Sequence, residues 1–376
     1  MLISKLQLKN FRLFSELLLE FKRQTTVLIA PNAMGKSSVV EAIRLLSIGQ
    51  SFRAGKIEEM IQIDRDLGRV RAKIHDNISS FKENLEIADE LVLAALITRG
   101  EVNGKRTRKL LFSVNDNRRQ KKKLVGQLLT VVFRPEDMRL IEGSPGRRRD
   151  YLDSLLVLTD YEYSTSLDKY NKALRRRNRL LSLIKENKQD QEVLTYWDMA
   201  LTKHGERLQK RRRSLIKFVN SQVEQPLPMK INYKPSLISK KRIQDHRTAE
   251  IATGFTLIGP HKDDFEVMLD LQLGEDGASS YKALDAYGSR GQKRMGVIWL
   301  KKAELVYLKH KTNKLPILIL DDILSELDKD NREKVLDLID GEQIIITTVN
   351  QDLVKEVEQK LGQVEVIRLA EVLQKS

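Results

Sequence analysis

Hydrophobic and polar residues alternate near the start of the chain. Leu6 and Leu8 lie between lysines and a glutamine, and the same alternation returns over residues 17–21. A period of two is typical of a half-buried β-strand, so both stretches are predicted strands. The apolar run at residues 26–29 predicts a buried strand, and further short strand-like runs recur as far as residues 131–133.

The period changes between residues 135 and 225. Apolar residues there recur every three or four positions, in two stretches that the polar segment 185–191 separates. This spacing predicts two amphipathic helices in an antiparallel hairpin. Each arm has about 30 residues and would extend roughly 45 Å. Prolines 226, 228 and 235 mark the end of the hairpin.

The α/β pattern returns from about residue 250. Apolar runs predict further strands at 255–258, 317–320 and 344–346. The sequence therefore predicts one α/β unit formed by residues 1–134 and 250–376, interrupted by a helical insertion domain at 135–249.

Composition and charge narrow the classes of function. The chain has 67 Lys and Arg against 52 Asp and Glu, a formal net charge of +15, which favours a polyanionic partner. It has no cysteine, which excludes disulfides and thiolate sites, and five histidines with no HExxH motif argue against a metalloprotease. The longest apolar runs are too short to span a membrane, and the N-terminus has no signal-peptide core, so we expect a cytoplasmic protein with no membrane partner.

A candidate phosphate-binding loop follows the buried strand at 26–29. Residues 30–38 read Ala-Pro-Asn-Ala-Met-Gly-Lys-Ser-Ser and lead into apolar residues at helical spacing. Such a loop binds phosphate through backbone N–H groups, with Lys36 at the β/γ oxygens and the Ser37 hydroxyl on Mg²⁺. The expected nucleotide-binding residues of the loop are Ala30, Asn32, Ala33, Gly35, Lys36, Ser37 and Ser38.

A second candidate element is the apolar strand that ends in Asp321 and Asp322. In a Walker B strand the first carboxylate holds Mg²⁺ through water, and the second orients or deprotonates the attacking water. An ordinary core strand that enters an acidic helix cap would read similarly. The following Ser325-Glu-Leu-Asp328 is typical of the D-loop of ATP-binding-cassette (ABC) ATPases, which favours the catalytic interpretation.

The third element is Ser289-Arg-Gly-Gln292 at the start of a predicted long helix. The Ser289 hydroxyl, the helix N-terminus and a close backbone approach at Gly291 offer donors to an anion. A capping box between Ser289 and Gln292 is the structural alternative, and both can hold together. In ABC ATPases this element contacts the γ-phosphate bound by another subunit, so ATP joins the dimer.

These motifs and several other stretches together resemble the RecF family of bacterial DNA replication and repair ATPases over nearly the whole chain. The stretches that carry the resemblance are Lys9–Arg12, Phe52-Arg53, Arg134–Met138, Gly143–Arg149, Leu152-Asp153, Gly259–Asp264 and Asp321–Asp328. The resemblance implies an ABC-type P-loop ATPase head with an inserted α-helical hairpin. It implies Lys36 and Asp322 as catalytic residues, Ser37 and Asp321 as Mg²⁺ ligands, and ATP bound also by Ser289, Gly291, Gln292 and Asp328.

The resemblance also implies a slow ATP hydrolase that forms an ATP-dependent homodimer on double-stranded DNA. It would bind near single-strand gaps and junctions, and would work with RecR and RecO to place the RecA recombinase. The basic clusters at 121–123, 147–149, 175–177 and 211–213 either contact DNA phosphates or form solvated helix faces. Basic and aromatic residues are not interleaved, which favours backbone binding over base stacking.

Departures from the family pattern leave alternatives open. Ala30 and Ala33 replace loop glycines, and a positive φ at either would cost about 1–2 kcal/mol. Lys262 replaces an arginine, and Thr347 stands near the usual switch histidine. A DNA-binding scaffold with little or no ATPase activity is therefore the alternative function. Cohesin-like or Rad50-like proteins carry far longer coiled coils, and about 50 residues after the acidic strand leave no room for the nuclease domain of the overcoming-lysogenization-defect class.

Overall fold

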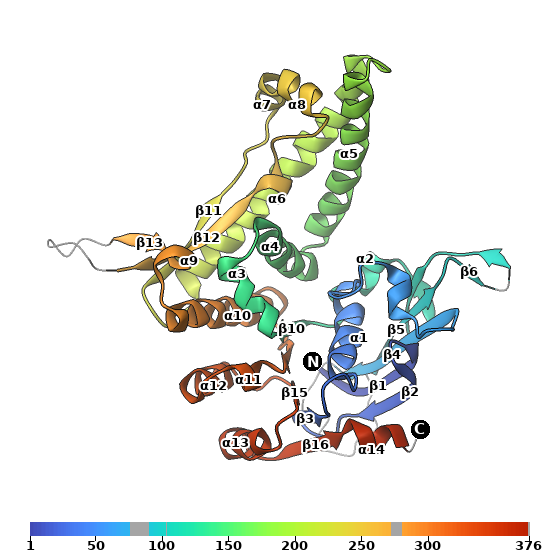
Figure 1. Cartoon of the computed structure of the whole chain (residues 1–376), viewed down its shortest axis with the longest axis vertical. Coiled ribbons are helices and arrows are strands. Elements are labelled where there is room, and N and C mark those ends of the chain that lie inside the picture. The colour runs from blue at the N-terminus through green and yellow to red at the C-terminus, as the bar shows by residue number, and fades with distance from the viewer. Residues whose placement is uncertain (76–89, 103, 272–279, 375–376) are drawn as a thin grey trace. The chain divides into compact units, whose positions relative to one another are not determined.

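The computed structural model describes residues 1–75, 90–102, 104–271 and 280–374. The chain forms two compact units (Figure 1): Met1–Asp137 with Glu304–Ser376, and Met138–Ala303. Residues 250–303, which the sequence analysis placed with the head, thus belong to the compact unit that holds the helices. The division into functional domains at 134 and 249 stays a prediction.

One sheet of the first unit is antiparallel. Its strands lie in the order β2 (Phe14–Glu20), β1 (Leu2–Phe11), β4 (Leu67–His75), β5 (Leu91–Thr98), β8 (Leu110–Val114) and β9 (Asn117–Arg119). The two alternating stretches of the sequence form β1 and β2, as predicted, and Leu6 pairs with Leu19 across them. Both leucines are buried, which is why the alternation was visible in the sequence.

The second sheet of this unit is parallel and carries the candidate site. Its order is β10 (Thr130–Phe133), β14 (Ile317–Asp321), β15 (Ile344–Thr348), β3 (Thr25–Ile29) and β16 (Val364–Arg368). Every residue of β3, β10, β14 and β15 is buried, as expected for parallel strands covered on both faces. The predicted strands at 26–29, 131–133, 317–320 and 344–346 are confirmed. Strands from opposite ends of the sequence therefore lie side by side.

Helices follow several of these strands. Helix α1 (Lys36–Ile48) follows β3, and α11 (Ile323–Glu326) and α12 (Lys329–Leu336) follow β14. The remaining small elements of the first unit are β6 (Glu101–Val102), β7 (Lys105–Arg106), α2 (Lys121–Leu124), α13 (Asp352–Leu361) and α14 (Leu369–Gln374). Among the described residues, no helix is long and apolar enough to cross a bilayer.

The second unit contains the predicted hairpin. Helices α5 (Tyr161–Lys185) and α6 (Thr195–Gln222) pack against each other (Figure 1), with 25 and 28 residues. The apolar spacing before the polar segment 185–191 predicted a single helix as the first arm, but α4 (Pro145–Thr159) is a separate helix. Asp160 ends α4 and caps α5, because its Oδ1 accepts a hydrogen bond from the Tyr163 amide at 2.9 Å.

A three-stranded sheet and short helices complete this unit. The sheet has the order β11 (Met229–Lys234), β12 (Asp264–Asp270) and β13 (Tyr281–Ala283), and the helices are α3 (Arg139–Glu142), α7 (Lys240–Asp245), α8 (Arg247–Thr253) and α9 (Leu284–Tyr287). The long α10 (Arg290–Thr312) begins here, directly after Ser289 as predicted. The predicted strand at 255–258 is wrong. Instead, Thr256 follows α8 and its amide bonds the side chain of Asn178 at 3.0 Å.

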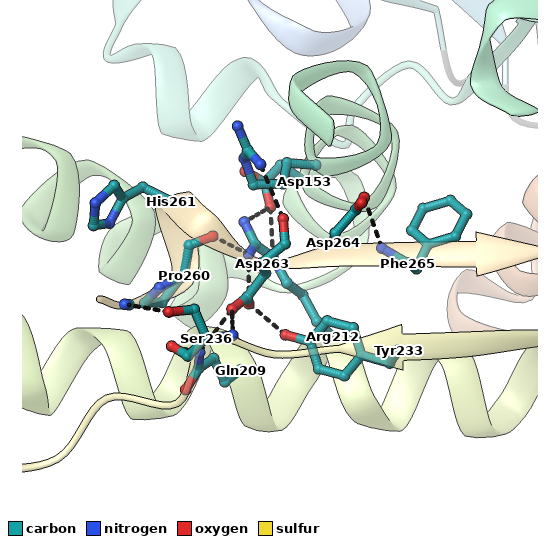
Figure 2. A network of polar contacts seen from close by, with 12 residues as sticks. Asp153, Gln209, Arg212, Tyr233, Ser236, Pro260, His261, Asp263, Asp264 and Phe265 are labelled. Carbon is teal, nitrogen blue, oxygen red and sulfur yellow. Dashed lines mark hydrogen bonds and ion pairs between the residues drawn. The ribbon is translucent and has the colours of Figure 1, made fainter. Parts of the chain in front are cut away.

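Buried ion pairs tie the hairpin to the segment before β12 (Figure 2). Arg212 of α6 donates to Asp153 of α4 at 2.7 Å and to Asp263 at 2.9 Å. Asp263 is fully buried and accepts further hydrogen bonds from Gln209 at 2.8 Å and from the hydroxyl of Tyr233. Since every partner is itself satisfied, these charges hold the loop at 259–264 in one arrangement.

The basic runs of the second unit are divided between the interior and the surface. Arg148 pairs with Asp264 at 2.6 Å, Arg177 pairs with Glu250 at 2.6 Å, and Arg212 pairs as described above. One arginine of each run is therefore structural. Neither sequence interpretation, phosphate contact or solvated face, is right for these three residues, because their acidic partners come from distant parts of the chain.

Candidate nucleotide site

The carboxyl ends of three parallel strands meet at one edge of the sheet in the first unit. Strand β3 leads into the loop at residues 30–35, β14 ends at Asp321, and β15 ends at Thr348. In open α/β sheets, ligands bind outside the carboxyl ends of the strands, at the point where the order of the strands reverses. The sheet thus brings the two halves of the sequence-predicted site together.

Lys36 lies beneath the loop. Its side chain is buried, and Nζ donates hydrogen bonds to the carbonyl oxygens of Ala30 at 2.9 Å and Pro31 at 3.3 Å. The same ammonium lies 3.5 Å from Oδ2 of Asp322. The loop therefore holds a cation among exchangeable oxygen partners, where an incoming phosphate can replace them.

Ser37, Asp321 and Thr347 form a set of oxygen atoms beside Lys36. The hydroxyl of Thr347 donates to Asp321 Oδ1 at 2.8 Å, and the hydroxyl of Ser37 donates to the same atom at 3.5 Å. Burial raises the pKa of Asp321, against the lowering effect of the Thr347 hydrogen bond. Thr347, which the sequence places near the position of the usual switch histidine, thus contacts the first carboxylate of the site.

This oxygen set fits Mg²⁺ better than a metal that needs a complete protein cage. Mg²⁺ is usually held by one or two carboxylates together with water and substrate phosphates. Within the described ranges, no three His, Cys, Asp or Glu side chains gather as a metal cluster. Ser37 and Asp321 supply the small protein share that such a nucleotide-bound cation requires.

Asp322 combines an unusual backbone conformation with a carboxylate oxygen that no described residue contacts. It adopts a left-handed backbone conformation, φ 55°, and its amide donates to the carbonyl and hydroxyl oxygens of Thr347, each at 3.1 Å. Its Oδ1 is buried and has no hydrogen-bond partner within the part of the chain that the structure describes. Burial raises the pKa of this carboxyl, and Lys36 opposes the rise. A raised pKa and an unpartnered carboxylate oxygen, on a residue that lines a pocket, are features of a general base.

The pocket over the loop has a volume of about 180 Å³. Its lining residues are Leu13, Asn32, Ala33, Gly35, Lys36, Ser37, Ser38, Arg53 and Asp322. Seven of these were predicted from the sequence. Leu13 and Arg53 were not assigned to the site, although Arg53 belongs to the Phe-Arg pair that contributed to the family resemblance. Their place in the pocket depends on the fold, since neither belongs to the loop motif.

The backbone conformation of the loop requires glycine at position 35 and strains the alanine at position 33. Gly35 has φ 93°, and a Cβ there would lie 2.3 Å from Cζ of Phe14, so only glycine fits. Ala33 has φ 64°, in the region that costs residues with a Cβ about 1–2 kcal/mol. Ala30 is not among the residues with positive φ, so its methyl group is tolerated without this strain.

The Ser-x-Gly-Gln element lies in the second unit and forms the predicted capping box. The amide of Gln292 donates to Ser289 Oγ at 3.2 Å, and the amide of Ser289 donates to Gln292 Oε1 at 2.8 Å. A Cβ on Gly291 would meet only Ser289 Oγ, at 4.0 Å, whereas one on Gly288 would lie 2.5 Å from Leu284 Cδ1. Packing within the chain therefore explains Gly288 but leaves open space at Gly291.

Comparison with known proteins decides the family. The family model described as the RecF/RecN/SMC N terminal domain matches residues 2–369. A protein named DNA replication and repair protein RecF from Caldanaerobacter subterraneus subsp. tengcongensis is 32% identical over 92% of this chain and 94% of its own. The chain belongs to the RecF family.

Further relatives agree. The RecF protein of Thermoanaerobacter sp. strain X514 is 33% identical over 94% of this chain and 96% of its own. Solved structures named as the recombination mediator protein RecF with ATPrS and with ATP, in the RecFOR pathway, match with TM-scores of 0.77 and 0.76. Both are 30% identical, over 93% of this chain and 93% and 92% of theirs. The ABC-type ATPase head fold expected from the sequence is confirmed.

One predicted residue of this RecF-family chain has a structural role besides the one expected. Asp328 caps α12, where its Oδ1 accepts from the amide of Asn331 at 3.0 Å. The same carboxylate also accepts from the side-chain amide of Asn331. The cap fixes the position of the D-loop carboxylate at the start of a helix.

Proposed function

We propose that this RecF-family protein binds ATP with Mg²⁺ at the loop of the first unit and dimerises through it. The observation that carries the proposal is the meeting of Lys36, Ser37 and Asp322 around one pocket. Asp321 joins them through the hydroxyl of Ser37, from which 284 positions separate it. A lysine, a hydroxyl and two carboxylates with distinct surroundings are the groups that phosphoryl transfer from ATP requires.

Each side chain has a role in this proposal. Lys36 exchanges the carbonyl oxygens of Ala30 and Pro31 for phosphate oxygens. Ser37 and Asp321 would hold Mg²⁺, which neutralises charge on the phosphates. Asp322 accepts a hydrogen bond from the attacking water through its free Oδ1 and orients that water for in-line attack. We propose that hydrolysis is slow and acts as a timer, as the resemblance to the RecF family implies.

The dimer contact would come from the second unit of the partner protomer. Its Ser289, Gly291 and Gln292 would contact the γ-phosphate bound by the first protomer, and Asp328 would contribute from the D-loop. The open space at Gly291 supports this, since none of the described residues lies close enough to require a glycine there. ATP then stabilises the dimer, and ADP, which lacks the γ-phosphate, releases it.

We further propose that the ATP-bound dimer binds double-stranded DNA near single-strand gaps and junctions in the cytoplasm. RecR and RecO are the proposed partners, with RecA loading as the indirect result. The support is the RecF name of the relatives, the RecFOR pathway of the similar structures, and a net charge of +15 that suits a polyanion.

Sizing by light scattering with ATP, with ADP and without nucleotide tests the proposal. The wild type should dimerise with ATP only, and Lys36→Ala should lose both nucleotide binding and dimerisation. A molecular mass that ATP never changes would contradict the proposed function.

A DNA-binding scaffold with little ATPase activity is a second candidate, favoured by the strained backbone at Ala33. Measuring ATP turnover with and without DNA separates the two. Turnover that Lys36→Ala abolishes supports the ATPase, whereas DNA binding without any turnover supports the scaffold.

A further inference from the structure

The outer faces of the hairpin helices carry two rows of exposed basic side chains. The α5 row consists of Lys169, Lys172, Arg175, Arg176 and Arg179, and the α6 row of Lys203, Arg207, Lys210, Arg213 and Lys217. Residues three or four apart on a helix are neighbours, so each row forms one stripe. At 1.5 Å per residue, the α5 row extends about 15 Å and the α6 row about 21 Å.

These cations are almost unmatched by acidic groups. Nine of these ten side chains form no ion pair with any described residue. The tenth, Arg207, lies 3.8 Å from Glu162. No acidic residue occurs between 169 and 185, and Glu206 is the one acid between 203 and 217. Ordinary solvated helices pair opposite charges three or four positions apart. Here Asp168 and Glu206 are the acidic residues with such a spacing to members of the rows, and most neighbours at that spacing are like charges, which is unfavourable. A solvated face gives no reason for such an arrangement, but a polyanion does.

The two rows meet on one flank of the hairpin. His204 of α6 lies there with its buried Nδ1 unpartnered within the described part of the chain. Its pKa is lowered first by burial and then by Lys169, Lys203 and Arg207. Ion pairs from Arg177 to Asp198 and from Arg211 to Asp160 set the antiparallel register of the two helices, which brings Lys169 of α5 near Lys203 and Arg207 of α6. The two rows therefore meet end to end near His204.

The basic stretches of α5 and α6 are not uniformly exposed, because some of their arginines are buried in ion pairs. Arg177 and Arg212 lie within the same basic stretches of α5 and α6, yet both are buried in ion pairs. Arg177 and Arg212 pair with acidic residues in the interior, and the exposed Arg211 pairs with Asp160 at 2.8 Å. Most of the other exposed cations of the two helices form no ion pair with a described residue. The helices are thus rigidly held while their outer faces stay available.

We propose that this two-row surface of the hairpin binds the phosphate backbone of double-stranded DNA. The inference rests on the proposed DNA binding and assigns that binding to α5 and α6. A 21 Å row spans about six phosphate steps of one DNA strand at 3.4 Å each. No Phe, Tyr or Trp lies between 203 and 217, so the surface offers charge without a platform for stacking single-strand bases.

The test compares two triple variants of the full chain that lower the net charge equally. One is Lys203→Gln with Lys210→Gln and Lys217→Gln in the α6 row. The matched control is Lys22→Gln with Lys334→Gln and Lys355→Gln, three exposed lysines of the first unit outside the site. Binding of a blunt duplex of about 30 base pairs is measured by fluorescence anisotropy with ATP over a salt series.

The α6-row variant should bind the duplex about 10-fold more weakly. The slope of log affinity plotted against log salt concentration should fall in magnitude by about 2–3, one for each lost phosphate contact. The control should stay within about twofold of the wild type. Lys→Arg at the same three α6 positions should restore both values, because charge is what the DNA reads. DNA-free ATP turnover and ATP-dependent sizing should be unchanged in all variants.

Wild-type affinity and slope in the α6-row variant, or an equal loss in the control, would overturn this inference while the proposed function stands. Loss of the ATP-dependent dimer in the α6-row variant would also count against it, because the row would then serve assembly. A wild type that binds no duplex would overturn the proposed function itself.

Discussion

At the scale of single residues, the loop motif and the strand that ends in two carboxylates were readable from the sequence. Lys36 and Asp322 come together as predicted, because buried parallel strands carry them to the same edge. The pocket contributions of Leu13 and Arg53 were not readable, since they depend on the path of the chain after β1 and α1. The buried role of Arg212 was equally hidden, because its partners lie 48 to 59 positions away.

The strained loop residue gives a first prediction. Ala33→Gly should raise the free energy of unfolding by about 0.5–1 kcal/mol, because relief of about 1–2 kcal/mol exceeds the entropy that glycine adds to the unfolded chain. Ala30→Gly is the matched control, and it should lower stability because Ala30 has no positive φ. Denaturant unfolding of the nucleotide-free protein measures both, and a loss of stability in Ala33→Gly would contradict the strain argument.

The raised pKa of Asp321 gives a second prediction. The folded protein binds this proton more tightly than the unfolded chain does, so ionisation of Asp321 lowers stability at pH values above its folded pKa. Asp321→Asn should therefore raise the melting temperature of the nucleotide-free protein at pH 8, and the gain should shrink as the pH falls toward about 4. Melting curves across this range check it. A gain that grows on acidification would show that the sign is wrong.

At the scale of elements, strands with alternating or continuous apolar residues were predicted well, since burial itself produces those patterns. The strand predicted at 255–258 is wrong because a buried residue in a loop gives a similar apolar pattern. Ile258 is buried by packing in a loop, and no strand partner is involved. The break of the first hairpin arm at Asp160 was missed because the apolar spacing continues across it, while the capping side chain ends one helix and starts another.

The first turn of α10 gives a third prediction, in which stability and function change in opposite directions. Gly291→Ala should raise the free energy of unfolding by up to about 1 kcal/mol, because alanine is the better helix former and open space surrounds the site. It should nevertheless weaken ATP-dependent dimerisation if the partner's nucleotide approaches the backbone there. Thermal melting and light scattering with ATP measure the two effects.

Gly288→Ala is the control for that experiment. Its Cβ would lie 2.6 Å from the carbonyl oxygen of Leu284. This variant should therefore have a lower free energy of unfolding than the wild type, in contrast to Gly291→Ala. A Gly291→Ala protein that dimerises as the wild type does would remove the support that the open space gives to the dimer contact.

At the scale of the whole molecule, the presence of two α/β halves around a helical hairpin was predicted, but the compact units were not. The composition of the sequence changes near residue 250, whereas the second unit continues to Ala303. The reason is that β12 and the loop before it are tied to α4 through Arg148 and to the hairpin through Arg212. Such ties are invisible to periodicity.

The fourth prediction concerns the assembly as a whole. Asp322→Asn should bind ATP and remain dimeric for longer than the wild type, because the group proposed to orient water is lost while Lys36 and Ser37 remain. Its ATP turnover should fall at least about 100-fold, the usual contribution of a general base. Light scattering with ATP and a phosphate-release assay measure the two properties. A monomeric Asp322→Asn protein would refute the separation of binding from hydrolysis.

The parallel sheet also has a consequence for biosynthesis. Among the described residues, β3 pairs with β15 and β16, and β10 pairs with β14. Each early strand of this sheet can therefore pair only after β14, β15 and β16, which begin at residue 317, have been made. The second unit is continuous and leaves the ribosome before those partners do. The hairpin can therefore fold first on the nascent chain, and the nucleotide pocket closes only after β14 and Asp322 have left the ribosome.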